Sequence, residues 1–327
     1  MMEPEPLDFN SPDGDPVGWE VEAEPWQDPF ERRVTHLATG IKLVQRRVPR
    51  SEGREREYLY DLLETEARMG ARLLTLLGRA YPAELPRLIG YSLDVEEPFV
   101  LLSDYRGEPV SRYSGALLIT DQRAMQVSLL RAVRILSACG IVHRRIEPAT
   151  VRWDGSAVQL TDLSHATLIG NRRLRMGEAP YACPAQRQGT GLAATSDDLW
   201  SAGMVIYRTV TGREIADLPD LSATPALQPI NDVFSGSPPS AQEMLARLRA
   251  PDPMRSLSVE QDLGLEEGRA AFDRAREAKQ EPVAATENVT RAQPVIEEEG
   301  GRLPWWARWL PLAVLLVLLV LLWVVTR

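Results

Sequence analysis

The sequence is poor in cysteine and lysine, and both shortages exclude classes of protein. Its two cysteines, Cys139 and Cys183, lack the spacing of a metal site and cannot build a disulfide framework, which is typical of a reduced, cytosolic protein. Its two lysines are Lys42 and Lys279, and arginine supplies all other bases, as in proteins of GC-rich genomes. No arginine cluster alternates with aromatic residues as single-strand binding requires, so we expect no nucleic-acid partner.

Basic residues are absent from the first 31 positions, which hold ten acids. The rest of the chain is close to neutral, so the formal net charge of -9 comes from this end of the chain. Residues 1–28 are also rich in proline, aspartate and glycine, and we expect them to form an acidic disordered tail. The acidity therefore says little about the partners of the folded body.

Charge is absent from residues 309–325, which are rich in leucine and valine and have tryptophan near both ends. As a helix this run would be about 26 Å long, close to the lower limit for crossing a bilayer. It predicts one transmembrane anchor over residues 304–327, with a buried core helix as the alternative. Arg302 and Arg308 precede the run, so the positive-inside rule favours a single-pass plasma-membrane protein with a cytoplasmic body.

Between the two ends we expect a folded domain over residues 29–258 and a polar helix and linker over residues 259–303. The hydrophobic pattern of the domain changes from strand-like to helix-like along the chain. It predicts strands at 41–48, 88–93, 99–103, 151–153 and 158–160, and helices at 55–78, 121–139 and 199–210. This order indicates an α+β fold.

Several segments carry a family resemblance. Residues 140–155 (GIVHRRIEPATVRWDG) resemble the catalytic loop of protein kinases and the hairpin that follows it. Four further segments resemble kinase motifs in the family's order: LTDLSHA at 160–166, YACPAQ at 181–186, SDDLWSAGMVIY at 196–207 and APDPMR at 250–255. The resemblance implies a two-lobed protein-kinase-like fold, with a small β-rich lobe and a large helical lobe, and the uncharged run adds one C-terminal transmembrane helix.

The catalytic loop departs from the family where the chemistry is performed. His143 and Arg144 match the pattern, but Arg145 stands at the position of the proton-accepting aspartate. A guanidinium group has no lone pair with which to accept a proton. Glu147 replaces a lysine that would attract phosphate, and Thr150 replaces the metal-binding asparagine with a poorer ligand. No catalytic residue of the loop is therefore intact.

The resemblance also implies positions for a nucleotide and a metal. Arg46 aligns with the lysine that contacts phosphate, although Lys42 is an alternative, and Glu66 aligns with the ion-pair partner of that lysine. Glu66 and the nearby Glu64 could equally lie on a solvated helix face. Asp162 aligns with the metal-binding aspartate, with a turn or cap residue as the alternative. Residues 20–39 contain no glycine, so a glycine-rich phosphate loop is missing and binding of ATP and Mg²⁺ is only weakly supported.

Other positions match residues with structural tasks. The resemblance implies that Asp198 holds the backbone of the catalytic loop, and that His143 and Leu163 stack between the lobes. Arg255 matches a late arginine, but Ala185 replaces its usual glutamate partner, so that ion pair is absent.

These observations predict a pseudokinase: a catalytically degenerate kinase-like protein that is tethered to the membrane and acts by binding a protein. The partner could be a true kinase or a membrane complex. The alternative is an atypical ATP-dependent transferase that uses Glu147 and Asp162. A nucleotide sensor without turnover lies between the two.

Overall fold

The computed structural model describes residues 4–26, 28–50, 53–213, 218–221 and 224–255. These residues belong to one compact unit. The predicted helix and linker (259–303) and the predicted anchor (304–327) lie outside the described residues. No helix in the described ranges is long and apolar enough to cross a membrane. Over the described residues the predicted fold class is therefore corrected to two lobes with no membrane-spanning helix, and the membrane location stays a prediction.

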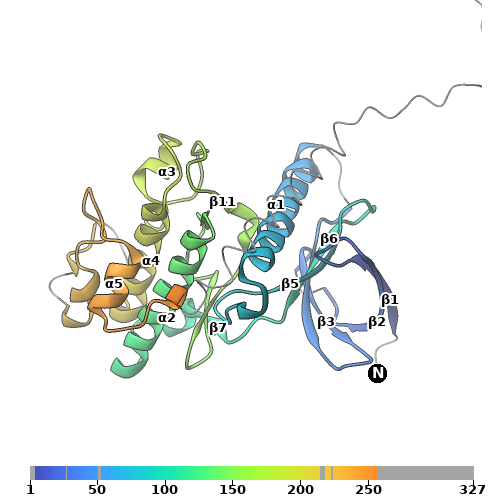
Figure 1. Ribbon diagram of the computed structural model, residues 1–327, viewed down its shortest axis with the longest axis horizontal. Coiled ribbons are helices and arrows are strands. Elements are labelled where there is room, and N and C mark those ends of the chain that lie inside the picture. The colour runs from blue at the N-terminus through green and yellow to red at the C-terminus, as the bar shows by residue number, and fades with distance from the viewer. Residues whose placement is uncertain (1–3, 27, 51–52, 214–217, 222–223, 256–327) are drawn as a thin grey trace, which may run out of the picture. The chain divides into compact units, whose positions relative to one another are not determined.

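The small lobe is an antiparallel sheet closed into a barrel, with one long helix packed beside it (Figure 1). Its strands follow the order β1-β2-β3-β4-β6-β5. Their bounds are β1 Glu5–Asn10, β2 Pro16–Ala23, β3 Glu31–His36, β4 Lys42–Arg47, β5 Leu88–Ser92 and β6 Phe99–Ser103. Helix α1 spans Arg54–Leu77 and is followed by the 3-10 helix η1, Gly78–Ala80.

The prediction of disorder over residues 1–28 is wrong for most of that range. Strands β1 and β2 pair with each other, and Asn10 of β1 also pairs with Tyr91 of β5, which closes the barrel. Leu7 and Phe9 alternate with polar residues, so β1 buries one face in the barrel core. Asp8 of β1 and Glu20 and Glu22 of β2 alternate with the core-facing residues, and the acidic composition that results masks this period-two pattern.

One glycine permits this closure. A Cβ on Gly90 would lie 2.1 Å from the ring of Phe9, far closer than atoms can approach. Glycine at this position of β5 therefore lets β1 lie against the barrel.

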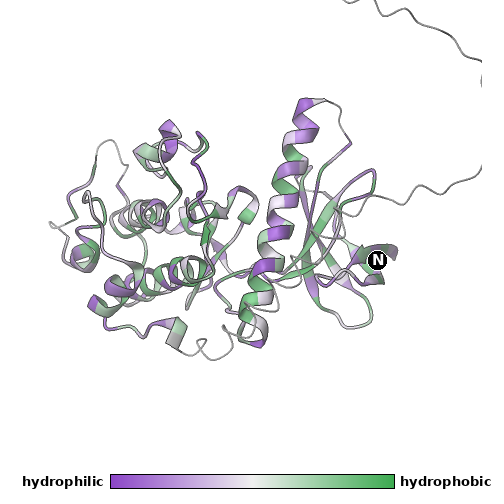
Figure 2. Ribbon diagram, turned by 45° about the horizontal axis from the view of Figure 1, so that its top comes forward, coloured by the Kyte–Doolittle hydropathy of each residue, from purple (hydrophilic) through white to green (hydrophobic). Residues whose placement is uncertain are grey.

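Helix α1 is amphipathic, and Figure 2 shows hydrophilic and hydrophobic bands alternating along it. Its buried positions include Leu63, Ala67 and Gly70 at helical spacing, which pack against the sheet. Gly70 allows a close approach, since a Cβ there would lie 2.8 Å from the side chain of Leu88. The packed face of α1 also carries a charged residue, Glu66, into the space between the lobes.

The large lobe is mainly helical and has a continuous apolar core around α2 and α4. Its helices are α2 Ile119–Ala138, α3 Pro184–Gln188, α4 Thr195–Thr211 and α5 Ala241–Arg247, with 3-10 helices η2 Val110–Tyr113, η3 Leu163–His165, η5 Pro225–Ile230 and η6 Pro253–Arg255. Its short strands are β7 Glu108–Pro109, β8 Ile141–Val142, β9 Val151–Trp153, β10 Val158–Leu160 and β11 Thr167–Leu168. The predicted hairpin at Asp154-Gly155 joins β9 to β10.

Candidate functional site

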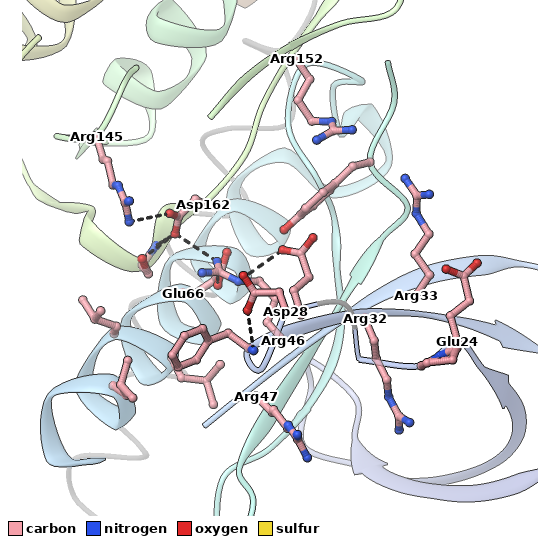
Figure 3. Close-up of a pocket in the computed structure, with 18 residues that line it drawn as sticks. Glu24, Asp28, Arg32, Arg33, Arg46, Arg47, Glu66, Arg145, Arg152 and Asp162 are labelled. Carbon is pink, nitrogen blue, oxygen red and sulfur yellow. Dashed lines mark hydrogen bonds and ion pairs between the residues drawn. The ribbon is translucent and has the colours of Figure 1, made fainter. Parts of the chain in front are cut away.

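A cavity of about 580 Å³ lies between the small-lobe sheet, α1 and the loops of the large lobe. Charged side chains line most of it (Figure 3). The lining arginines are Arg32, Arg33, Arg46, Arg47, Arg145 and Arg152, and the lining acids are Glu24, Asp28, Glu31, Glu66 and Asp162. The cavity thus contains all three residues predicted to contact a nucleotide or metal: Arg46, Glu66 and Asp162.

Arg46 of β4 and Glu66 of α1 form an ion pair across the small lobe. Glu66 is 2% exposed, and burial raises its pKa to about 7 against the opposing effect of Arg46. Burial also disfavours the charged form of Arg46, but the carboxylates of Glu66 and Asp162 outweigh this and raise its pKa. Glu66 therefore does not lie on the solvated helix face that the sequence left open as an alternative.

Asp162 is held between two guanidinium groups that come from different lobes. Its Oδ1 lies 3.0 Å from Nη1 of Arg46, and its Oδ2 lies 3.1 Å from Nη1 of Arg145 (Figure 3). Ser164 also donates its hydroxyl to Oδ1 at 2.5 Å. Burial favours the neutral acid, but Arg46, Ser164 and Arg145 together hold the pKa of Asp162 well below its usual range. Asp162 is therefore an ionised carboxylate with both oxygens engaged.

Arg145 links the catalytic-loop segment to this centre. Its Nε donates to Oε1 of Glu147 at 3.1 Å, while its Nη1 contacts Asp162 and lies 3.1 Å from Nε2 of His165. The ion pairs thus form one chain of alternating charge: Glu147, Arg145, Asp162, Arg46 and Glu66. Arg145 and Glu147 carry charges opposite to those usual at their positions in kinases. They neutralise each other, and Arg145 also neutralises Asp162.

Thr150 faces the loop itself. Its hydroxyl donates to the carbonyl of Arg145 at 2.7 Å and accepts from the backbone N–H of Glu147 at 3.1 Å. The side chain is buried. Thr150 therefore braces the turn that presents Arg145 and Glu147.

Asp198 of α4 accepts hydrogen bonds from the backbone of the catalytic-loop segment. Its two carboxylate oxygens accept from the N–H groups of His143 at 2.7 Å and Arg144 at 2.9 Å, and burial raises its pKa to about 7. His143 is fully buried, and burial lowers its pKa to about 4. Its Nδ1 accepts from the N–H of Arg145, so its Nε2 carries the proton and donates to the carbonyl of Thr161. The loop is thus rigidly supported although its chemical residues have changed.

The loop between β2 and β3 covers the cleft in place of a glycine-rich loop. Its Trp26 ring packs on the guanidinium of Arg47 at 3.6 Å and that of Arg32 at 4.6 Å. Arg47 also donates to the carbonyl of Pro29 in the same loop at 3.1 Å. Cation–π and hydrogen-bond contacts therefore hold this loop against the sheet.

Arg152 is a cleft residue that sequence reasoning missed. Its Nη2 donates to the carbonyl of Gly107 at 2.6 Å, and its guanidinium lies 5.6 Å from the ring centre of Tyr105. Residues 105–107 belong to the segment that connects the lobes. The sequence could have indicated this role, because Arg152 is the one charged residue in the otherwise apolar strand β9, and a buried charge requires a partner.

Searches against known proteins relate this chain to protein kinases. No family model matches. The chain is 28% identical over 175 residues to the serine/threonine-protein kinase PrkC of Bacillus subtilis. This alignment covers 49% of this chain and 26% of the relative. It is 28% identical over 156 residues to a probable serine/threonine-protein kinase PknB of Bifidobacterium longum, covering 44% and 22%. The chain is protein kinase-like.

Two further matches describe the extent of this similarity. The kinase-like chain is 24% identical over 155 residues to testis-specific serine/threonine-protein kinase 3 of mouse, covering 45% of this chain and 58% of the relative. The structure of the Cydia pomonella granulovirus kinase PK-1 aligns with a TM-score of 0.45 and 14% identity, covering 59% of this chain and 69% of the other. The alignments span about a quarter of the length of the two bacterial relatives.

The cleft of this kinase-like chain does not fit a magnesium ion. Magnesium is held in kinase-type sites by the aspartate that Asp162 retains and by the asparagine that Thr150 replaces. Both oxygens of Asp162 are engaged by cations, and the Thr150 hydroxyl is turned into the loop. Within the described ranges, no group of three or more His, Cys, Asp or Glu side chains is arranged to hold a metal.

Proposed function

We propose that the chain is a pseudokinase, a kinase-like protein that does not transfer phosphate and acts by binding a protein partner. The observation that supports it most strongly is the position of Asp162 between Arg46 and Arg145. A magnesium ion at this carboxylate would lie beside two fixed positive charges, and Coulomb repulsion would oppose its binding. Two arginines thus take the place of the metal.

The groups around Asp162 offer no replacement for the missing chemistry. Arg145 has no lone pair to accept the proton of a substrate hydroxyl. Glu147 is the nearest carboxylate in the loop, but its Oε1 already accepts from Arg145. The alternative of an atypical transferase requires Glu147 and Asp162 to be free for substrate and metal, and both are bound to the same arginine. The geometry therefore favours the pseudokinase.

The retained scaffold supports a role in binding. Asp198 and His143 keep the loop in a fixed shape, and the ion pair between Arg46 and Asp162 joins the two lobes. When the two lobes are fixed relative to each other, the surface that a partner binds is already ordered, so binding costs little conformational entropy. We infer that the partner is a protein, a true kinase being one candidate.

Two measurements on the purified full chain test the proposal. Incubation with [γ-³²P]ATP, Mg²⁺ and a general acceptor such as myelin basic protein is expected to give no transfer above a no-enzyme control. Thermal denaturation is expected to be unchanged by millimolar ATP with Mg²⁺, because a ligand that bound the folded state would raise Tm. Robust Mg²⁺-dependent transfer that Glu147→Gln abolishes would contradict the pseudokinase and support the transferase.

A further inference from the structure

Two segments of the large lobe lie side by side on its surface beyond the cleft. Residues 170–173 run antiparallel to residues 191–193, with Gly170 N–H bound to the Ala193 carbonyl at 2.9 Å and Arg173 N–H bound to the Gly191 carbonyl at 3.1 Å. An isolated bridge joins Arg172 to Leu192 in the same way. This pairing places an arginine-rich stretch beside the turn at residues 189–191.

The turn has the sequence Gly189-Thr190-Gly191 and presents Thr190 to solvent. Both glycines have positive φ, 69° and 72°, which suits glycine and makes a tight turn. The backbone of Gly189 packs directly on Arg175, since a Cβ at Gly189 would lie 2.9 Å from the Arg175 nitrogen. Thr190 is thus an exposed hydroxyl at the tip of a turn that touches the arginine-rich stretch.

The arginines around this turn carry unbalanced positive charge. The stretch from residue 167 to residue 192 contains four arginines and one acid, Glu178. Arg173 is neutralised by Asp197, with contacts of 2.9 and 2.7 Å, and also donates to the Thr190 carbonyl at 2.8 Å. The other three are exposed, and no ion pair or side-chain hydrogen bond is found for them among the described residues: Arg172, Arg175 and Arg187.

We propose that Thr190 is phosphorylated by a separate Ser/Thr protein kinase, and that Arg172, Arg175 and Arg187 bind the resulting phosphate. A phosphothreonine carries close to two negative charges and three acceptor oxygens, which match guanidinium groups. In the kinase family the usual phosphorylation site lies in the stretch that runs from the position of Asp162 to the position of Ala185 in this chain. Thr190 lies after that stretch. This acceptor site stands whether or not the cleft of this chain transfers phosphate.

The modification is an ordinary phosphoryl transfer in which this chain supplies only the acceptor. Thr190 Oγ forms a bond to the γ-phosphorus of ATP held by the other kinase, and the bond from that phosphorus to the β–γ bridging oxygen breaks. ADP leaves, and the hydroxyl proton passes to the catalytic base of that kinase. The bound phosphate would join residues 172–175 to residues 187–190. Because Arg173 already links Thr190 to Asp197, the phosphate would also fix the start of α4.

Phosphorylation is tested on the full chain with a Ser/Thr kinase that prefers arginine-rich substrates, [γ-³²P]ATP and Mg²⁺, followed by peptide mapping with mass spectrometry. We expect phosphate on Thr190 and loss of that label in Thr190→Val. Phosphate on other residues with Thr190 unmodified would overturn the proposal. A parallel reaction without added kinase separates the two proposals, since label incorporated there would refute the pseudokinase and leave the acceptor site standing.

The role of the arginines is tested on full chain with phosphothreonine genetically encoded at Thr190. A ³¹P NMR pH titration should give a phosphate pKa below the ordinary value of about 6, because nearby cations favour the dianion. The pKa should return toward that value in Arg175→Ala/Arg187→Ala, and should not change in the control pair Arg54→Ala/Arg79→Ala, which removes two exposed arginines elsewhere. Equal phosphate pKa values in all three proteins would overturn the arginine role.

Discussion

Replacing Asp162 by Asn should destabilise the protein by about 2–3 kcal/mol. Asp162 is 15% exposed and Arg46 20%, so the substitution removes the shared partner of a partly buried cation. Breaking a fully buried ion pair costs about 3–5 kcal/mol. The cost here is smaller because Arg46 keeps Glu66, and because Arg145 is 42% exposed and keeps Glu147.

The pH dependence of this loss has a defined sign. The pKa of Asp162 is depressed in the folded state from an ordinary value of 3.8. A depressed carboxylate pKa stabilises the fold above the unfolded pKa, and this contribution disappears as pH falls below it. The part of the difference in unfolding free energy between the wild type and Asp162→Asn that comes from ionisation of Asp162 should therefore shrink as pH falls below about 4.

Urea denaturation measures this difference, with the slope of unfolding free energy against urea checked for equality between variants. Asp232→Asn is the matched control, because Asp232 and Arg247 form a pair at 2.7 Å that is 40% and 42% exposed. Such a surface pair contributes less than about 1 kcal/mol. A loss in Asp162→Asn no larger than that of the control would refute the account of Asp162 as the centre of the charge chain.

Two further substitutions test other parts of the structure. His143→Gln removes a buried imidazole whose pKa is lowered to about 4 from 6.5, so the difference in unfolding free energy between wild type and variant should rise with pH between these values by up to about 1.4 kcal/mol per pH unit. A difference from urea unfolding that stays constant across this range would contradict the burial argument. Gly90→Ala should lower the free energy of unfolding by about 2–3 kcal/mol, because the new methyl group overlaps Phe9. Gly236→Ala is the control and should change it little, because no atom lies within 4 Å of the added methyl group. Equal unfolding midpoints for the two variants would show that β1 does not need this close contact.

The order of motifs predicted most of the large lobe because each motif is local. The predicted helix at 121–139 and the hairpin at Asp154-Gly155 are present with bounds that differ by at most a few residues. The spacing of Arg46 and Glu66 also placed them correctly beside each other, since a strand and a following helix fix the relation of their facing residues.

The remaining features depend on tertiary contacts that no local pattern contains. Replacement of an aspartate by Arg145 indicated lost chemistry, but its contact with Asp162 depends on how the lobes close. Thr150 was considered as a metal ligand, and only the folded loop shows that its hydroxyl faces inward. Strand β1 was missed because its acidic composition outweighed the alternation of Leu7 and Phe9.

Binding of Mn²⁺, a spectroscopic substitute for Mg²⁺, tests the central claim that arginines occupy the metal position at Asp162. Free Mn²⁺ is measured by electron paramagnetic resonance as it is titrated into the full chain with millimolar ATP, with ATP alone as the reference. Because Arg46 and Arg145 hold both oxygens of Asp162, the protein should add no Mn²⁺ site to those of free ATP. One additional site per chain in the wild type, lost in Asp162→Asn, would contradict it.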